Sequence, residues 1–474
     1  MSPLLLISLL LVYIYTVISS ISVILLENRN SVRSLSWILV LVFLPFVGLF
    51  LYLIIGQNYR KQKIISKKSV RHSSKLPTVE LHPEDYSDFV TRKAHLNLIR
   101  LLYKNSDAAA YAFNKIEVLS DGTNTFRAMF EAMEAAHDHI HIEFFIFEDD
   151  RISNELRKLL IRKAKAGVRI RMIYDYLGSF GLTTSYLRSL REAGVYVRPF
   201  LPMRLRLRRS KINFRNHRKI LIVDGKYGFT GGLNFADRYL FGNTLGKWRD
   251  TFIRMEGAAV HGLQSQFLTD WYFVERKLIT DPKYYPTPEK HEENVVQIVS
   301  SGPDTDWESI MQGIASAIMS SRNYVYMHTP YFVPNDVILN AVIIAALSGA
   351  DVRLMIPERS DSRLSDACSF SYLGEILEAG VKVYQYSRGF LHSKAIVVDD
   401  FISIVGSANL DERSFNQNFE ANAFIYDKET ALTLKELFLN DIKNCHEISY
   451  PDWDNRKRSQ KMKESFARLF SPII

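Results

Sequence analysis

The chain has 474 residues, enough for roughly two or three domains with a large core. Its two cysteines, Cys368 and Cys445, are too few for a disulfide scaffold or a four-cysteine zinc site, and they suit a reducing compartment. The formal net charge of +9 favours anionic partners: phospholipid, nucleic acid or a phosphorylated substrate. Composition alone does not choose among these three classes.

The first sixty residues contain two apolar stretches long enough to be membrane spans. Residues 3–26 and 35–57 carry no charged side chain, and a helix needs about 20 apolar residues to cross a bilayer. We therefore expect a transmembrane hairpin over residues 1–59, and membrane helices tolerate a proline such as Pro45. A cleaved signal peptide is the alternative for the first stretch, although it lacks a basic start. A buried core helix is the alternative for the second.

Basic residues after the hairpin predict its orientation. Seven lysines and arginines precede the first acid, Glu80, whereas the short loop between the spans carries only Arg29 and Arg33. The positive-inside rule then predicts a multi-pass protein of the cell membrane, with the catalytic domains on the cytoplasmic side. Residues 60–110 are interpreted as a basic juxtamembrane linker and helix, which suits an anionic leaflet or simply fixes topology.

The rest of the chain alternates between strand-like and helical stretches, and its sequence repeats. The alternation predicts an α/β fold of mixed sheets flanked by helices. Four segments recur in order, at offsets between 175 and 186 residues: EFFIFEDD with TPYFVPND, AGVRIRMIYD with ADVRLMIPER, LREAGVYVRPF with ILEAGVKVYQY, and HRKILIVDGKYGFTGGLNFADR with HSKAIVVDDFISIVGSANLDER. We expect two similar domains, residues 111–285 and 286–450, related by pseudo-twofold symmetry.

The first copy carries an insertion before its final segment. Glu192 lies 25 residues before His217, whereas Glu378 lies 14 residues before His392, so the first copy has about eleven extra residues. Apolar residues alternate with the charges in this insertion. A flap that presses on anionic lipid headgroups is the preferred interpretation, because the insertion directly precedes His217 and the chain is expected to be tethered to lipid, and a solvated loop is the alternative. The candidate headgroup-binding residues are Arg204, Arg206, Arg208 and Arg209.

Each copy contains a His-x-Lys-x4-Asp motif. The two motifs are His217, Lys219 and Asp224, and His392, Lys394 and Asp399. Side chains two apart on a strand point to the same face, so each copy projects one imidazole and one ammonium together. A turn of small residues with an asparagine follows each motif, and such turns let backbone and amide groups approach a phosphate. Candidate phosphate-binding residues are Asn234, Ser407 and Asn409.

These residue types suit displacement at a phosphodiester. One histidine attacks phosphorus, the other protonates the departing alkoxide, and the roles reverse in the second displacement. The lysines and asparagines would hold the anionic phosphate. The scheme needs no cofactor, and we expect no metal site. His139, His141 and Glu143 could form a metal cluster, but we prefer a strand whose alternate side chains are polar.

Two further carboxylates are candidates for orienting the imidazoles. Asp250 follows the first motif and Glu420 follows the second, and each histidine needs a partner for its second nitrogen. A surface position is the alternative for both. We expect Asp224 and Asp399, which end their strands, to make structural or charge-network contacts.

The paired motifs, the hairpin, the RSFNQNFE segment and the terminal RLFSPII resemble the phospholipase D superfamily, and within it the bacterial cardiolipin synthases. The resemblance implies a phosphatidyltransferase that joins two phosphatidylglycerol molecules into cardiolipin and releases glycerol. It also implies a phosphatidyl-histidine intermediate on His217 or His392, and we favour His217. One departure is Gly232, which stands where the family has the serine that Ser407 preserves, so a hydroxyl contact to phosphate is lost there.

Other functions remain open. Water could resolve the intermediate in a phospholipase D-type hydrolase, or another alcohol could do so in a related phosphatidyltransferase. A nuclease could use the same motifs, but the two spans favour a lipid over a nucleic acid partner. A scaffold without activity would need a damaged histidine or lysine, and all four are present. The sequence leaves the oligomeric state open.

The last segment, residues 451–474, predicts an amphipathic helix. Met462, Phe466, Leu469 and Phe470 recur at helical spacing among basic residues. Contact with a membrane and packing against the core are equally compatible with this pattern.

Overall fold

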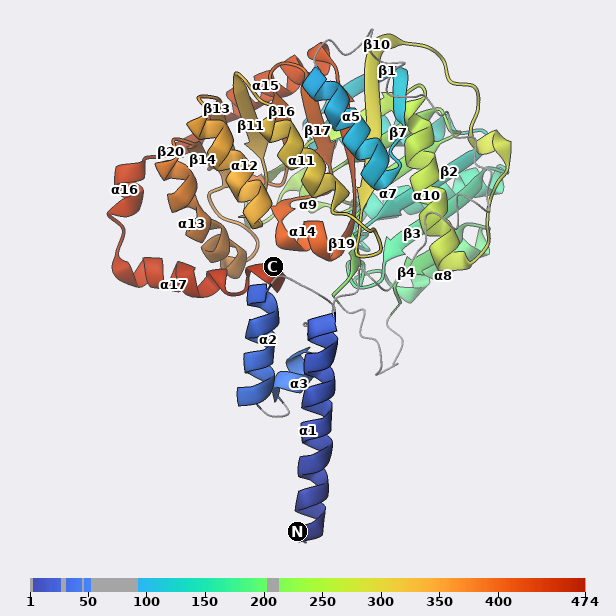
Figure 1. The fold of residues 1–474 in the computed structure, drawn as a ribbon. Helices are drawn as coiled ribbons and strands as arrows, with labels where there is room; N and C mark the ends of the chain where they lie inside the picture. Colours follow the sequence, from blue (N-terminus) through green and yellow to red (C-terminus); the bar gives the residue numbers. More distant parts are fainter. Residues whose placement is uncertain (1–2, 27–30, 45–46, 53–92, 203–212, 474) are drawn as a thin grey trace. The chain divides into compact units, whose positions relative to one another are not determined.

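The structure, a computed structural model, describes residues 3–26, 31–44, 47–52, 93–202 and 213–473. These residues belong to two compact units, the N-terminal helices and a larger α/β body, and each is described by itself. Figure 1 shows the helices and strands of both units.

The N-terminal unit contains α1 (Pro3–Leu26), α2 (Ser31–Phe43) and α3 (Val47–Leu51). The Tyr13 hydroxyl donates to the carbonyl of Leu41, 2.9 Å away, so α1 and α2 pack side by side. Within the described ranges, no helix combines the length and the apolar character that crossing a membrane requires. The predicted span over residues 35–57 overlaps α2 and α3, and its residues 45, 46 and 53–57 lie outside the described residues, so its full extent stays a prediction.

The α/β body is built on one continuous sheet, and its strand order shows the duplication. The first repeat supplies β1 (Ala110–Leu119), β2 (His139–Phe144), β3 (Arg169–Asp175), β4 (Tyr196–Phe200), β6 (Ile220–Val223), β7 (Tyr227–Gly231) and β9 (Phe252–Glu256). The second supplies β10 (Glu292–Ser301), β11 (Tyr324–His328), β13 (Asp351–Pro357), β14 (Lys382–Tyr386), β16 (Ala395–Val398), β17 (Ile402–Gly406), β19 (Asn418–Tyr426) and the edge strand β20 (Cys445–Ile448).

From the centre outward, the order is β1-β9-β7-β6-β2-β3-β4 in one direction and β10-β19-β17-β16-β11-β13-β14 in the other. Each strand of the first series therefore has a counterpart in the second. At the centre, β1 and β10 pair antiparallel, with Ala110 opposite Gln297. A twofold axis between these two strands generates this order, and it relates the two repeats.

Helices lie on both faces of the sheet, as Figure 1 shows. The first repeat has α6 (Gly122–Glu134), α7 (Arg151–Lys165), α8 (Thr184–Glu192) and α10 (Ala259–Glu275), and the second has α11 (Ser309–Met319), α12 (Asp336–Leu347), α13 (Arg363–Glu378) and α15 (Lys428–Ile442). Alternate side chains of β2 point to opposite faces of the sheet. Ile140 and Ile142 join the apolar core with α6 and α7, whereas His139 and His141 face Gln264 of α10. The predicted α/β fold with mixed sheets is confirmed.

One helix crosses from the start of the body into the second repeat. α5 (Lys93–Ser106) precedes β1 in sequence, yet Leu98 and Leu102 are buried in the same core as Ile310 and Ile314 of α11. The helix predicted within residues 60–110 is therefore present. The basic run that precedes it lies outside the described residues.

The strand pairing corrects two of the four sequence matches between the repeats. Glu143 lies opposite Ile220, which follows Lys219. His328 lies opposite Ala395, which follows the equivalent Lys394. Glu143 therefore corresponds to His328, so the first match is displaced by one residue. In the same way, the pairing of β3 with β2 and of β13 with β11 makes Arg171 the counterpart of Arg353. The second sequence match is therefore displaced by two residues. The sequence alignment was displaced because neighbouring positions of apolar strands carry similar residues.

The C-terminal segment is not the single helix expected from residues 451–474. It forms α16 (Tyr450–Asp454), α17 (Arg458–Arg468) and η4 (Ser471–Ile473). Arg456 lies between the two helices, stacks over the ring of Trp453 at 3.4 Å, and pairs with Glu464 at 2.8 Å. These contacts fold α17 back and break the helix.

Candidate active site

Two short strands carry the motif histidines into the centre of the body. β5 (Arg215–Asn216) leads to His217 and pairs with the start of β19, in the second repeat. β15 (Gly389–Leu391) leads to His392 and pairs with β8 (Lys247–Arg249), in the first repeat. Each histidine segment thus lies beside the chain that carries the carboxylate of the other repeat.

The two imidazoles are consequently paired crosswise. His217 Nδ1 lies 2.9 Å from Glu420 Oε1 and 3.0 Å from Oε2, whereas His392 Nδ1 lies 2.7 Å from Asp250 Oδ2. Both histidines are less than 10% exposed, and both carboxylates are buried. The sequence selected Asp250 and Glu420 as orienting carboxylates and placed each after its own motif. In the structure each one contacts the histidine of the opposite repeat, a pairing that the sequence left open.

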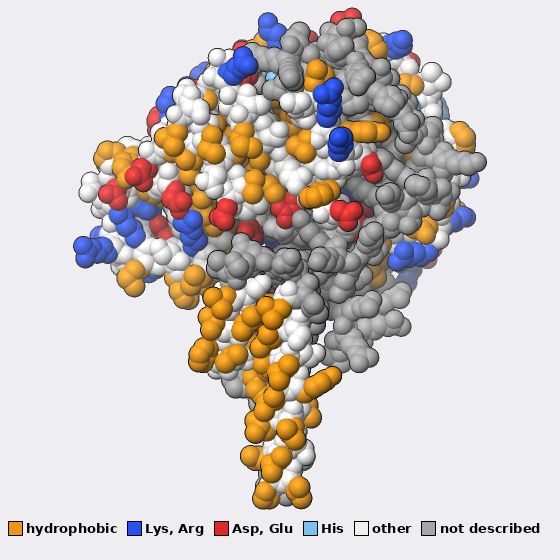
Figure 2. All heavy atoms as spheres, viewed as in Figure 1, with side chains coloured by type: hydrophobic (Ala, Val, Ile, Leu, Met, Phe, Trp, Pro, Cys, Tyr) orange, Lys and Arg blue, Asp and Glu red, His pale blue; other side chains and the backbone are white. Residues whose placement is uncertain are grey.

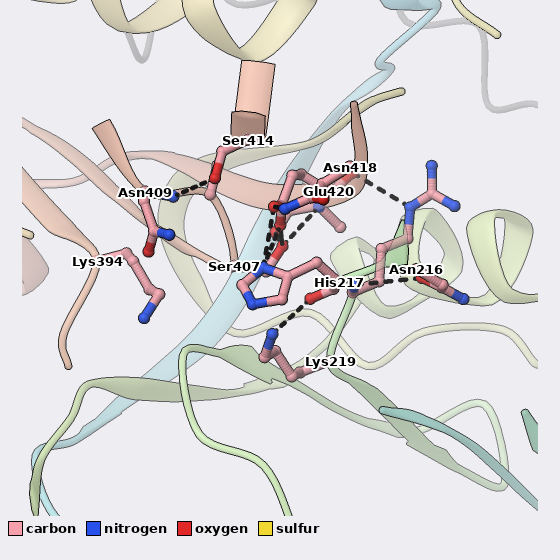
Figure 3. A network of polar contacts seen from close by, with 12 residues as sticks. Asn216, His217, Lys219, Lys394, Ser407, Asn409, Ser414, Asn418 and Glu420 are labelled. Carbon is pink, nitrogen blue, oxygen red and sulfur yellow. Dashed lines mark hydrogen bonds and ion pairs between the residues drawn. The ribbon is translucent and has the colours of Figure 1, made fainter. Parts of the chain in front are cut away.

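The motif lysines are placed identically in the two repeats. Lys219 Nζ donates to the carbonyl of His217, and Lys394 Nζ donates to the carbonyl of His392, both at 2.6 Å. Figure 3 shows Lys219 and Lys394 on different sides of the His217 imidazole. The structure therefore brings one imidazole and one ammonium from each repeat into a single buried site.

The serine and glycine that distinguish the repeats both lie against the carboxylates. The Ser407 hydroxyl donates to Glu420 Oε2, as Figure 3 shows, and also accepts from the N–H of Ala421 at 3.0 Å. A Cβ at Gly232 would lie 2.2 Å from Asp250 Oδ1, which leaves no room for a side chain. Glutamate with serine and aspartate with glycine are therefore two alternative ways to place a carboxylate against the opposite imidazole.

The pair of His217 and Glu420 favours a neutral imidazole and an ionised carboxylate. Burial lowers the pKa of His217 to about 4, against the opposing attraction of Glu420. Burial alone would raise the pKa of Glu420, but its hydrogen bonds with His217 and Ser407 and the charge of Lys219 outweigh it and hold the pKa below its usual value. The Nδ1–H of a neutral His217 then donates to Glu420, and the lone pair on Nε2 is left available.

The pair of His392 and Asp250 has a different balance. Burial, together with the charges of Lys394 and Lys219, lowers the pKa of His392 well below its ordinary value. Burial also raises the pKa of Asp250 to about 7, against the attraction of Lys394, and lowers the pKa of Lys394 to about 8. Near pH 7 Asp250 is therefore about half protonated, whereas Glu420 is ionised.

The motif aspartates lie at the far ends of their strands. Asp224 accepts the backbone N–H groups of residues 137, 138 and 139 at 2.7 to 2.8 Å, and Asp399 accepts those of residues 322, 323 and 324 at 2.8 to 3.0 Å. Both have a positive φ, 54° and 52°. Each carboxylate fixes the turn that enters β2 or β11, as expected for structural contacts, and neither touches an imidazole.

The two asparagines make different contacts. Asn234 accepts the N–H of Ile146 at 3.1 Å and donates to the Tyr239 hydroxyl at 2.7 Å, so its amide already has partners within the protein. Asn409 donates to Asp411 at 2.9 Å, and its Oδ1 is buried. Both brace the turns after β7 and β17, and a phosphate contact at either position stays a prediction.

Several site residues were missed by the sequence reading. The ring of Phe145 meets His217 edge-on at 5.0 Å, and Trp248 and Tyr239 lie 5.3 and 5.5 Å from His392. These rings restrict water around the imidazoles. Nothing in a single sequence distinguishes such aromatic residues from core residues.

A buried ion pair behind His217 was also missed. Arg218 donates to both oxygens of Asp270 at 2.7 and 2.8 Å and to the carbonyl of Glu420 at 3.2 Å. It therefore links the motif to α10 and to the backbone of Glu420 on β19. The signal was available, because a residue between His217 and Lys219 on a strand must point to the opposite face, where a buried arginine requires an acid.

The candidate metal cluster on β2 is a packed polar layer. His139 and His141 both lie 3.2 Å from the side-chain oxygen of Gln264, and Arg171 lies 3.0 Å from the other nitrogen of His141. In the described part of the chain, no group of three or more His, Cys, Asp or Glu side chains has an arrangement that could hold a metal ion. The four arginines of the predicted flap lie outside the described residues, so their placement stays a prediction.

Known proteins share both the sequence and the fold. The family described as cardiolipin synthase, PLD-like domain, matches residues 129–271 and 314–442, and the phospholipase D-nuclease N-terminal family matches residues 12–57. The chain is 40% identical over 457 residues to cardiolipin synthase 2 of Bacillus cereus, covering 95% of this chain and 89% of that one. It belongs to the cardiolipin synthase family of phospholipase D-like proteins.

One further relative supports this membership, and a solved structure shares the fold. The major cardiolipin synthase of Bacillus subtilis is 39% identical over 476 residues, which cover 98% of both chains. A crystal structure of phosphatidylserine synthase from Haemophilus influenzae covers 80% of this chain and all of its own, with a TM-score of 0.60 and 14% identity, and it shows the fold alone. The resemblance inferred from the sequence is confirmed, and the relatives support the expected phosphatidyltransferase activity of a cardiolipin synthase.

Replacing Asp224 by asparagine should lower stability rather than chemistry. The neutral amide keeps one acceptor oxygen and tolerates the positive φ, but it loses charged hydrogen bonds, so we expect a loss of about 2 kcal/mol in the free energy of unfolding. Thermal unfolding and kcat of the folded protein check this, with Asp399→Asn as the matched variant. Lost turnover with an unchanged melting temperature would place Asp224 in the chemistry instead.

Proposed function

We propose that this protein transfers a phosphatidyl group from one phosphatidylglycerol to another, releasing glycerol and forming cardiolipin. The observation that carries the proposal is the single buried site in which two imidazoles, each held by a carboxylate of the opposite repeat, lie among two lysines. Such a site supplies a nucleophile, an acid and positive charge for phosphate oxygens. The family membership and the two cardiolipin synthase relatives support phosphatidylglycerol as the lipid.

In the first displacement, His217 is the nucleophile. Its Nε2 lone pair forms a bond to phosphorus as the bond from phosphorus to the glycerol oxygen breaks, giving phosphatidyl-His217. The ionised Glu420 stabilises the positive charge that develops on the imidazole. The departing alkoxide takes the Nε2 proton of His392, and the Asp250 proton moves to Nδ1 of His392, so the glycerol leaves neutral.

In the second displacement the roles reverse. A hydroxyl of the second phosphatidylglycerol attacks phosphorus, its proton passes to Nε2 of His392, and Nδ1 returns a proton to Asp250. The bond between phosphorus and His217 breaks, and the imidazole is neutral again. Lys219 and Lys394 hold the phosphate throughout, because a bound anion raises the pKa of a buried ammonium and keeps it charged.

The assignment of roles rests on the inequality of the two carboxylates. Ser407 donates to Glu420 and stabilises its ionised form, whereas Gly232 offers Asp250 no hydroxyl. A nucleophilic histidine needs an ionised partner, and an acidic one benefits from a partner that carries a proton near neutral pH. His217 fits the first requirement and His392 fits the second.

Hydrolysis is the competing outcome, since water can replace the second lipid. The burial of both histidines and the rings of Phe145, Trp248 and Tyr239 around them favour transfer, because they leave little space for water beside the intermediate.

The proposal includes a membrane anchor at residues 1–59, with the α/β body in the cytoplasm. Its support is the absence of charged residues from positions 3–26 of the sequence, the match of residues 12–57 to the N-terminal family, and the basic run that follows. The arginines at 204, 206, 208 and 209 complete the proposal as a flap that attracts anionic headgroups. An insertion directly before His217 would bring the donor lipid to the nucleophile.

Purified protein given only phosphatidylglycerol, in buffer with a metal chelator, should release glycerol and form cardiolipin in equal amounts. The reason is that both displacements use side chains of the protein. Lipid chromatography and an enzymatic glycerol assay measure the two products. Phosphatidic acid as the main product would identify a hydrolase.

His392→Ala and His217→Ala should separate the two histidine roles. With a phosphatidyl-p-nitrophenol donor, whose leaving group needs no acid, His392→Ala should release one equivalent of nitrophenol and stall, because nothing deprotonates the acceptor. His217→Ala should release none. A rapid-mixing absorbance trace and mass spectrometry of the modified peptide check this. A burst in His217→Ala with label on His392 would reverse the assignment.

The pH profile should expose the role of Ser407. The wild-type kcat/KM should fall as pH rises through about 7 to 8, because Asp250 and then Lys394 lose their protons. Ser407→Ala removes a hydrogen bond of about 1.5–3 kcal/mol from ionised Glu420, so the acidic limb should move up by about one pH unit or more.

The matched control is Ser403→Ala on β17, which is as buried as Ser407. Ser403 lies opposite Ile425, five residues along β19 from Glu420. It should leave both limbs unchanged. An unmoved acidic limb in Ser407→Ala, or a shift in the basic limb alone, would contradict the role given to the serine.

A further inference from the structure

The helix α17 packs on the second repeat through one face only. Ala467 is buried and its carbonyl accepts the Cys368 thiol of α13, while buried Glu464 receives both hydrogen bonds of Arg456 at 2.8 and 2.9 Å. Arg468 donates to Glu375 of α13 at 2.5 Å. These contacts fix the rotation of the helix about its axis, so the direction of its opposite face is also fixed.

That opposite face is apolar and exposed. Met462, Phe466 and Leu469 are 74%, 64% and 72% exposed, and their spacing of four and three residues places them on one side of the helix. Such large apolar side chains normally pack inside when an element has a free choice of rotation. Here the packed face is occupied by a charged, hydrogen-bonded glutamate and an alanine, and the large side chains point outward.

The charges around this face are basic. Arg458 and Lys463 are exposed and flank the apolar stripe, and Lys457 is exposed just before the helix. The acid within α17, Glu464, is buried against the body and neutralised by Arg456. In Figure 2 hydrophobic and basic side chains lie along the lower edge of this part of the surface, with Asp and Glu side chains above them. A stripe of this composition complements an anionic lipid surface better than a protein groove, which would need its own acids.

The helix is also connected to the active site. After α17, the Ser471 hydroxyl accepts from Tyr372 at 3.0 Å, and the carbonyl of Pro472 accepts from Gln417 at 2.8 Å. Gln417 ends α14 (Glu412–Asn416), which directly follows the turn that contains Asn409. Hydrogen bonds therefore link the segment that follows α17 to α14, and α14 follows the turn that contains Asn409.

We propose that Met462, Phe466 and Leu469 insert into the interface of an anionic bilayer and hold the second repeat against the membrane. The inference rests on the proposed function in one respect, the anionic lipid. It adds a contact that is independent of the N-terminal helices. A body held there receives its lipid substrates from the bilayer surface, without their transfer through water.

The direct test is quenching by lipid. The full chain with Phe466→Cys, labelled with a small fluorophore and reconstituted in phosphatidylglycerol vesicles, should lose emission when spin-labelled lipid is added. The same label at Leu432, an apolar residue of α15 that is 39% exposed, should not. Unsubstituted protein measures background labelling of Cys445, since Cys368 is buried. Equal quenching at both positions, or none at 466, would overturn the proposal. Because the measurement needs no turnover, it is independent of the proposed reaction.

The functional test compares two sets of serine substitutions. Replacing Met462, Phe466 and Leu469 together should raise the apparent KM for vesicle lipid about tenfold or more, since each loses the free energy of apolar burial. The kcat, and the activity on short-chain lipid dispersed in detergent, should stay unchanged. Leu432→Ser with Leu439→Ser on α15 is the control and should change neither. Equal loss on vesicles and on dispersed lipid would show a structural role for α17 and refute the membrane contact.

Discussion

The site depends on one interaction, the crosswise pairing of each motif histidine with a carboxylate of the other repeat. The imidazoles reach Glu420 and Asp250 because β5 joins β19 and β15 joins β8 across the twofold axis. The backbone repeats the crossing, since His217 donates its N–H to the carbonyl of Phe419 at 2.9 Å and His392 donates to Arg249 at 2.8 Å. Neither repeat alone contains a motif histidine together with its carboxylate, so the chemistry and the association of the repeats have the same structural origin.

The duplication supplies symmetry, and the chemistry proposed for the site needs asymmetry. The difference is introduced at one position of each repeat, Ser407 and Gly232, and is matched by the length of the carboxylate that each touches. A glutamate reaches the opposite imidazole with space beside it for a donor hydroxyl. An aspartate is shorter, so its carboxylate lies against its own turn and excludes any side chain there. The missing serine at Gly232 is therefore better explained by contact with Asp250 than by a lost contact with phosphate.

Much of this arrangement was predictable, and the remainder depends on pairing that a single sequence does not encode locally. The motifs reveal His217 and His392 because alternation on a strand fixes which side chains share a face. The sequence selected Asp250 and Glu420 but left their partners open, because two strands of two and three residues decide the crossing. The sequence alignment of the repeats was wrong by one residue at Glu143. Neighbouring positions of apolar strands have similar residues, whereas strand hydrogen bonding allows only one register.

The C-terminal helix illustrates a different limit. Its sequence was equally compatible with packing and with membrane contact, and the structure shows a helix that has a surface for each. The buried pair of Arg456 and Glu464 decides the rotation, because a buried carboxylate left without its arginine is strongly destabilising. Turning α17 to bury Phe466 would expose that pair and remove its packing against α13. The apolar stripe is therefore held outward by the electrostatics of the opposite face, a coupling that hydrophobic periodicity does not reveal.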